Sequence, residues 1–238
     1  MFRLWFNVFD SIVTDYSAQL IGALGAAAIL WGSVQALRAE RFKLLVAYST
    51  VAQIGYFFLA IPLVQGIGTA VVAVSGAVYL MLSHALAKAA MFASAGTILH
   101  VAGHDRINDL AGINQSYPVT VFTIAIAGVS LVGLPPSGGF MGKWLLLQAA
   151  FTSGQWWWVV VLLLGSLLAA GYIFRVIAHA FTHLDELPPV QELDWRMQWP
   201  ALVIAVLAMM LGLLAYPLAE IMGVSEVLSN TYRPAVMP

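Results

Sequence analysis

Two lysines stand alone in long apolar stretches of this chain. Lys88 is the one formally charged residue in the stretch 44–104. Lys143 is the one formally charged residue in the stretch 110–174. An ammonium group is costly in hydrocarbon, and ionisable residues at that depth usually line a polar cavity that carries ions or protons. We therefore expect Lys88 and Lys143 to serve ion or proton transfer.

His84 lies one helical turn before Lys88 in the string SHALAKAAMF. The two side chains therefore share one face of a helix, about 6 Å apart. Histidine titrates near neutral pH and burial disfavours a charged amine, so this pair could gain and lose protons. In the alternative, His84 bonds a facing backbone group and Lys88 pairs with a buried carboxylate. The sequence offers no carboxylate near that depth, so the alternative requires one from another subunit.

Five further polar side chains are secondary candidates for a relay. They are Gln53, Ser83, Gln148, Arg175 and His179. A single polar residue in a membrane helix commonly hydrogen-bonds a neighbouring helix instead. Arg175 lies near a helix end, where its long side chain could reach the membrane surface. Lys143 could also reach the surface in this way, instead of lying in a buried site.

The string GLPPSGGF, residues 133–140, interrupts the apolar segment that carries Lys143. Pro135 and Pro136 remove backbone donors, whereas Gly138 and Gly139 permit non-helical dihedral angles. A break inside the membrane frees backbone groups, which is tolerated only where protein or water satisfies them. Interrupted helices of this kind mark ion or substrate sites in transporters. A proline kink that serves packing alone is the alternative.

The composition identifies an integral membrane protein, because 61% of the 238 residues are hydrophobic and 9% are charged. The net charge of −1, without a basic patch, excludes nucleic acid as a partner. The chain has no cysteine, which excludes disulfides, iron–sulfur ligation and cysteine zinc sites. No nucleotide, hydrolase or metalloprotease motif is present. We expect no metal, no cofactor and no catalytic residues in this chain.

Only helices can satisfy the backbone in lipid, so the fold class is an all-α polytopic bundle. We expect about six spans, near 18–37, 43–63, 68–101, 117–153, 156–183 and 198–222. The expected organisation is a helical stub (1–17), a transport repeat (18–183), a polar loop (184–197) and a final membrane helix with a tail (198–238). The distribution of lysine and arginine predicts that the end with Arg38, Arg41 and Arg106 is cytoplasmic.

Three strings together resemble a known family. They are RFKLLVAYSTVAQIGYFFLAI (41–61), HALAKAAMF (84–92) and GLPPSGGFMGKW (133–144). They are similar to the carboxy-terminal half of the antiporter-like proton-translocating subunits of respiratory complex I, membrane-bound hydrogenases and multi-subunit cation/proton antiporters. The resemblance covers residues 1–183 and implies the second five-helix repeat of that fold, with a broken helix, plus the final helix.

The resemblance also implies roles for residues. His84 and Lys88 match the family's proton relay along the middle of the membrane, and Lys143 matches the group that controls exit toward one side. Gln53 stands where many members have histidine, which leaves a relay role there open. The predicted function is a half-channel for protons in a multi-subunit cation/proton antiporter or redox-driven proton pump, without an active site of its own. A non-conducting scaffold and a quinone-binding subunit are the alternatives.

The expected partners follow from the same resemblance. The family's first repeat is missing here, so we expect a separate membrane chain to supply it within a larger complex in a bacterial or archaeal inner membrane. Protons are the expected cargo, and transport of Na⁺ stays open. Such a complex would belong to an NADH:quinone oxidoreductase, a hydrogenase or a similar translocase.

Overall fold

The computed structural model describes residues 14–64, 66–185 and 192–214, which are almost entirely helical. In chain order the elements are α1 (Asp15–Arg38), α2 (Phe42–Leu59), α3 (Gly66–Ala102), the 3-10 turn η2 (Ile107–Asp109), α4 (Ile113–Ser116), α5 (Pro118–Val132), α6 (Gly138–Thr152), α7 (Trp156–Ala180) and α8 (Trp195–Leu213). Five of them, α1, α2, α3, α7 and α8, are long and apolar enough to cross a membrane. The predicted all-helical polytopic bundle is confirmed.

Exposed side chains on the outer helices are strongly apolar. Leu163, Leu167 and Phe174 of α7, for example, are all largely exposed. A broad apolar surface of this kind is unfavourable in water and is satisfied by lipid tails. The chain is an integral membrane protein whose polar groups lie inside the bundle and at its two ends.

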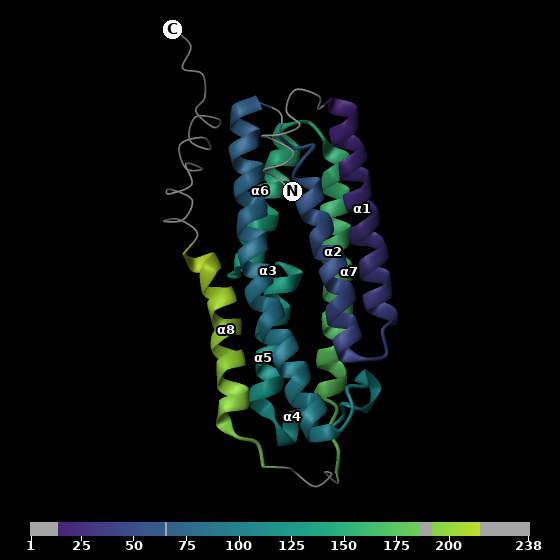
Figure 1. The fold of residues 1–238 in the computed structure, drawn as a ribbon, viewed down its shortest axis with the longest axis vertical. Helices are drawn as coiled ribbons and strands as arrows, with labels where there is room; N and C mark the ends of the chain where they lie inside the picture. Colours follow the sequence, from purple (N-terminus) through teal and green to yellow (C-terminus); the bar gives the residue numbers. More distant parts are fainter. Residues whose placement is uncertain (1–13, 65, 186–191, 215–238) are drawn as a thin grey trace.

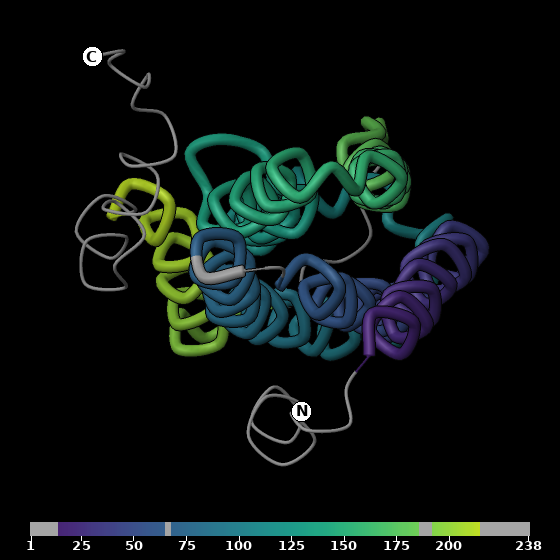
Figure 2. The backbone as a smooth tube through the Cα atoms, turned by 90° about the horizontal axis from the view of Figure 1, so that it is seen from above, coloured from purple at the N-terminus to yellow at the C-terminus, as the bar shows by residue number. Residues whose placement is uncertain are grey.

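The helices stand in two rows that enclose the buried polar groups. Figure 2 shows α3, α2 and α1 in one row, with α5, α6 and α7 in the other. α8 packs against α3, α5 and α6 at one edge (Figure 2). α1 and α2 pack closely because a Cβ on Gly25 would lie 2.6 Å from the Gly55 carbonyl oxygen. α2 and α7 lie in facing rows (Figure 2).

The two ends of the bundle differ in composition. α1 ends, α2 begins and α3 ends at the same end (Figure 1), and there Arg41 and Arg106 form an isolated backbone bridge. The opposite end carries the exposed rings of Trp156 and Trp157 at the start of α7. Tryptophan at one boundary and arginine at the other are typical of the two interfaces of a membrane.

The break between α5 and α6 lies where the sequence predicted an interrupted helix. The expected span 117–153 consists of α5 and α6, which follow each other along the height of the bundle (Figure 1). Of the expected stub (1–17), residues 1–13 lie outside the described residues, and residues 15–17 form the first turn of α1. Residues 186–191 of the polar loop and residues 215–238 of the tail also lie outside the described part. The predicted division into domains stays a prediction.

Candidate functional site

The break between α5 and α6 leaves backbone carbonyls free inside the bundle. α5 ends at Val132, and Gly133 follows in the left-handed conformation with a φ of 84°. The last four carbonyls of a helix lack an intrahelical donor. The amide of Gly133 turns back to the carbonyl of Val129. The carbonyls of Leu131 and Val132 are then available to side chains.

Lys143 of α6 donates hydrogen bonds to both of these carbonyls. Its Nζ donates to the carbonyl oxygens of Leu131 at 3.2 Å and Val132 at 2.9 Å, and it lies 4.6 Å from the ring centre of Tyr56. The residue is 3% exposed, so its side chain is inside the protein and does not reach the surface. The carboxyl end of α5 carries partial negative charge, which stabilises the ammonium. Its contacts among the described residues are all with electrically neutral groups.

Two glycines allow α6 to approach the end of α5. A Cβ on Gly133 would lie 2.7 Å from Cδ of Lys143, and the positive φ at this position already disfavours other residues. A Cβ on Gly139 would lie 1.9 Å from the carbonyl oxygen of Ser130. A side chain at either position would force the two half-helices apart and move Lys143 from its acceptors.

Lys88 of α3 has a different environment. Its Nζ donates to the carbonyl oxygen of Val46 and to the hydroxyl of Ser49, both on α2. The Ser49 hydroxyl donates in turn to the Val46 carbonyl at 2.9 Å. Lys88 is 6% exposed, and in the part of the chain that the structure describes it has no carboxylate partner. Both predicted lysines are therefore buried ammonium groups with neutral ligands.

His84 stands one turn before Lys88 on α3. Its ring meets Phe57 of α2 edge-on, and its Nδ1 is buried without a hydrogen-bond partner among the described residues. Phe57 directly follows Tyr56, whose ring lies beside Lys143, so α2 links the surroundings of His84 to those of Lys143.

Two of the secondary candidates also lie in this region. The Gln53 Nε2 donates to the carbonyl oxygen of Leu131 at 2.9 Å, the same oxygen that accepts from Lys143. The hydroxyls of Ser83 and Ser130 lie 2.6 Å apart and join α3 to the end of α5. Gln53 and Ser83 thus connect α2 and α3 to the break.

The other secondary candidates lie apart from the lysines. The Arg175 guanidinium donates to the carbonyls of Leu37 and Ala39, and the Nδ1 of His179 lies 2.8 Å from the Arg175 carbonyl oxygen. This arrangement satisfies free carbonyls where α1 ends. Gln148 lies on α6, and its buried Oε1 has no partner within the described residues. Relay roles for Arg175, His179 and Gln148 stay predictions.

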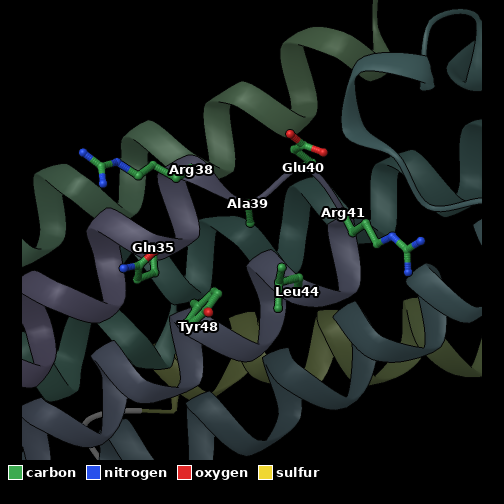
Figure 3. A pocket seen from close by; sticks show the side chains of 7 residues that line it. All are labelled: Gln35, Arg38, Ala39, Glu40, Arg41, Leu44 and Tyr48. Carbon is green, nitrogen blue, oxygen red and sulfur yellow. The ribbon is translucent and has the colours of Figure 1, made fainter.

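A polar pocket lies at the connection between α1 and α2, away from the break. It has a volume of about 340 Å³ and is lined by Gln35, Arg38, Ala39, Glu40, Arg41, Leu44 and Tyr48. Figure 3 shows that the Arg38 and Arg41 side chains point in opposite directions and do not converge on a common point. The buried lysine region therefore remains the candidate site.

The comparison with known families agrees with this architecture. Residues 1–169 match the family described as "NADH:quinone oxidoreductase/Mrp antiporter, TM". The chain belongs to this family. It is 35% identical over 229 residues to NADH-quinone oxidoreductase subunit N of Desulforudis audaxviator, an alignment that covers 92% of this chain and 44% of that protein. Another relative, a subunit of the Na(+)/H(+) antiporter of Bacillus subtilis, is 27% identical over 84% of this chain and 40% of its own length.

Solved structures show the same fold. The Mrp complex from a Dietzia species contains a chain that superposes with a TM-score of 0.80 at 22% identity, covering 93% of this chain and 48% of that one. The present chain thus spans less than half the length of each of these three relatives. The overall helix arrangement is therefore shared with the chain of the Dietzia complex.

The sequence analysis missed three residues that contact the lysines or their neighbours. Ser49 and Tyr56 lie on the same face of α2 as Gln53, at spacings of four and three residues, so the pattern was present in the sequence. Ser130 had no such signal, because its role depends on the contact between α5 and α3. The carbonyls of Leu131 and Val132 were expected to be free in general terms, but their donors were not identified.

Proposed function

We propose that this chain is a proton-conducting half-channel of a multi-subunit cation/proton antiporter or redox-driven proton pump. His84, Lys88 and Lys143 form the relay. The supporting observation is that two ammonium groups are buried, at 6% and 3% exposure, and that their acceptors within the described helices are all neutral. A buried ion pair resists loss of either charge, because the remaining charge would be uncompensated. A lysine with neutral ligands leaves no such charge behind when it loses its proton.

The proposed mechanism depends on repulsion between like charges. Protonation of one group disfavours protonation of its neighbour. A proton that binds at one lysine therefore promotes release of the proton from the other. His84, one turn from Lys88 on α3 and in contact with Phe57 of α2, carries the proton across in this proposal. Lys143 lies at the break, where a change in the α5–α6 connection alters its carbonyl ligands, and it controls exit toward one side.

The proposal also assigns the chain to a multi-subunit membrane complex. One relative is named as a subunit of NADH-quinone oxidoreductase and another as a subunit of an Na(+)/H(+) antiporter, and the Dietzia structure is an Mrp complex. By analogy we place this chain in a multi-subunit complex of a bacterial or archaeal inner membrane. There it packs against further membrane helices of the complex. Purification of the complex under mild conditions and identification of its subunits tests this assignment.

Proton flux in membrane vesicles that contain the complex tests the relay. An imposed potassium diffusion potential drives the flux, and a pH-sensitive dye reports it. Lys88→Ala and Lys143→Ala are each expected to reduce flux to background while the amount of assembled complex is unchanged. Unchanged flux in both variants would show that the buried lysines do not conduct and that the chain is a scaffold.

A further inference from the structure

A third buried polar group, the hydroxyl of Tyr172, lies on α7, whose row faces α2. Tyr172 is 0% exposed, and its hydroxyl has no hydrogen-bond partner in the described part of the chain. Leaving a buried hydroxyl without a partner is costly, so such groups usually have one. The packing of α7 against α2 indicates which groups serve Tyr172.

The register of α7 against α2 follows from a close contact two turns away. A Cβ on Gly165 of α7 would lie 2.4 Å from the Tyr56 hydroxyl of α2, so these positions face each other. The two helices run in opposite directions (Figure 1). About two turns along α7 from Gly165 is Tyr172, and about two turns back along α2 from Tyr56 is Ser49. Tyr172 therefore faces Ser49, with Gln53 in the intervening turn.

One further observation agrees with this register. Arg175 lies about one turn after Tyr172 on α7. It donates to the carbonyls of Leu37 and Ala39, just before α2 begins. The hydroxyl of Tyr172 thus lies between a ligand of Lys88 and the amide that shares a carbonyl with Lys143.

The donors and acceptors around Tyr172 are unequal in number. The Ser49 hydroxyl donates its single proton to Val46, and Gln53 donates through Nε2 to Leu131. The Gln53 Oε1 has no donor within the described residues, and the Ser49 oxygen has a second lone pair. Tyr172 has one hydroxyl proton and therefore serves one of these acceptors at a time.

We propose that Tyr172 is a positioning residue that couples the two lysines through the direction of its single hydroxyl proton. When Lys88 is charged, it draws electron density from the Ser49 oxygen, and the Tyr172 proton turns to Gln53. When Lys88 is neutral, the Ser49 oxygen becomes the better acceptor and the proton turns back. Gln53 transmits the change to the Leu131 carbonyl and so to Lys143. This inference rests on the proposed function, since it requires the lysines to change charge.

Flux measurements in vesicles with the assembled complex test the coupling. Tyr172→Phe removes the proton and keeps the ring, and it is expected to lower proton flux about tenfold, as is Gln53→Leu. The double variant Tyr172→Phe with Gln53→Leu should conduct as well as either single variant, because both remove the same link. Tyr48→Phe is the matched control, since Tyr48 (Figure 3) is a half-buried tyrosine of α2 whose ring meets Trp31 edge-on, and it should change flux less than about twofold.

Infrared spectroscopy tests the hydrogen bond itself. The phenol C–O band of Tyr172, identified by subtracting the spectrum of Tyr172→Phe, should shift in Gln53→Leu and in Lys88→Ala but not in Tyr48→Phe. A band that stays in place in both of the first two variants overturns the proposal, as do multiplicative losses of flux in the double variant.

The failures of the two proposals are distinguishable. If Lys88→Ala and Lys143→Ala abolish flux but Tyr172→Phe conducts normally, the relay stands and the role of Tyr172 is refuted. If both lysine variants conduct normally, the relay itself is refuted, and with it the coupling role of Tyr172, whatever the infrared band shows.

Discussion

Lys88 and Lys143 are both buried and both donate to neutral oxygens, but the origin of those oxygens differs. The acceptors of Lys143 are two backbone carbonyls that the end of α5 releases. The acceptors of Lys88 are a carbonyl within the continuous helix α2 and the side chain of Ser49. One site is produced by an interruption of a helix, and the other by a side chain on an intact one.

The origin of the acceptor oxygens determines which kind of change alters each lysine site. No side-chain substitution removes a backbone carbonyl, so the Lys143 site depends on the geometry of the break and on the glycines that permit it. One of the two acceptors of Lys88 is a side-chain hydroxyl, which a single substitution at Ser49 removes. The region at the break is therefore suited to conformational control, whereas the Lys88 site can be altered by side-chain chemistry.

Substitution at the break should have the largest effect. Gly139→Ala places a Cβ 1.9 Å from the Ser130 carbonyl oxygen, and the overpacking should destabilise the fold by about 3 kcal/mol. Proton flux should fall to background, with a lower unfolding temperature of the purified complex. Gly96→Ala is the matched control, because a Cβ there meets nothing within 4 Å and alanine favours the helix. Equal stability of the two variants would show that the half-helices are not tightly packed.

Removal of the Ser49 hydroxyl should have an intermediate effect, because it takes away the side-chain ligand of Lys88. Ser49→Ala deletes a hydrogen bond to a charged group and should lower flux about tenfold. Ser49→Thr keeps a hydroxyl and should restore much of the flux. Thr50→Ala is the control, since Thr50 also donates to the Val46 carbonyl but does not contact Lys88. If Thr50→Ala lowers flux as much as Ser49→Ala, the side-chain ligand has no special part in the Lys88 site.

The aromatic contact of Lys143 should contribute least. Tyr56→Leu removes the ring that lies 4.6 Å from Nζ and should lower flux about threefold, whereas Tyr56→Phe keeps the ring and should lower it less. The ratio of the two rates measures the contribution of the ring face. Identical rates for the leucine and phenylalanine variants would mean that the carbonyls alone stabilise the ammonium.

Much of the fold could be predicted because the bilayer leaves the chain few choices. The apolar segments had to be helices, and GLPPSGGF had to interrupt one of them. The two lysines stood out because charge is rare and expensive in such segments. The same reasoning placed His84 beside Lys88, since a spacing of four residues fixes a shared helix face.

The contacts between helices could not be predicted in the same way. Nothing local to Tyr172 indicates that it faces Ser49, because that depends on the register of α7 against α2. Likewise, nothing local to Arg175 indicates that its guanidinium donates to the carbonyls of Leu37 and Ala39 at the end of α1. Sequence periodicity identifies the face of a helix on which a residue lies, whereas tertiary packing determines what that face meets.

The neutral ligands of Lys88 and Lys143 have an electrical consequence. Within the described helices no fixed negative charge offsets a proton that resides on either lysine, so its whole charge is subject to the voltage across the membrane. Moving one elementary charge through that field involves about 2.3 kcal/mol per 100 mV. The fraction of each lysine that is protonated therefore depends on the membrane potential as well as on proton concentration.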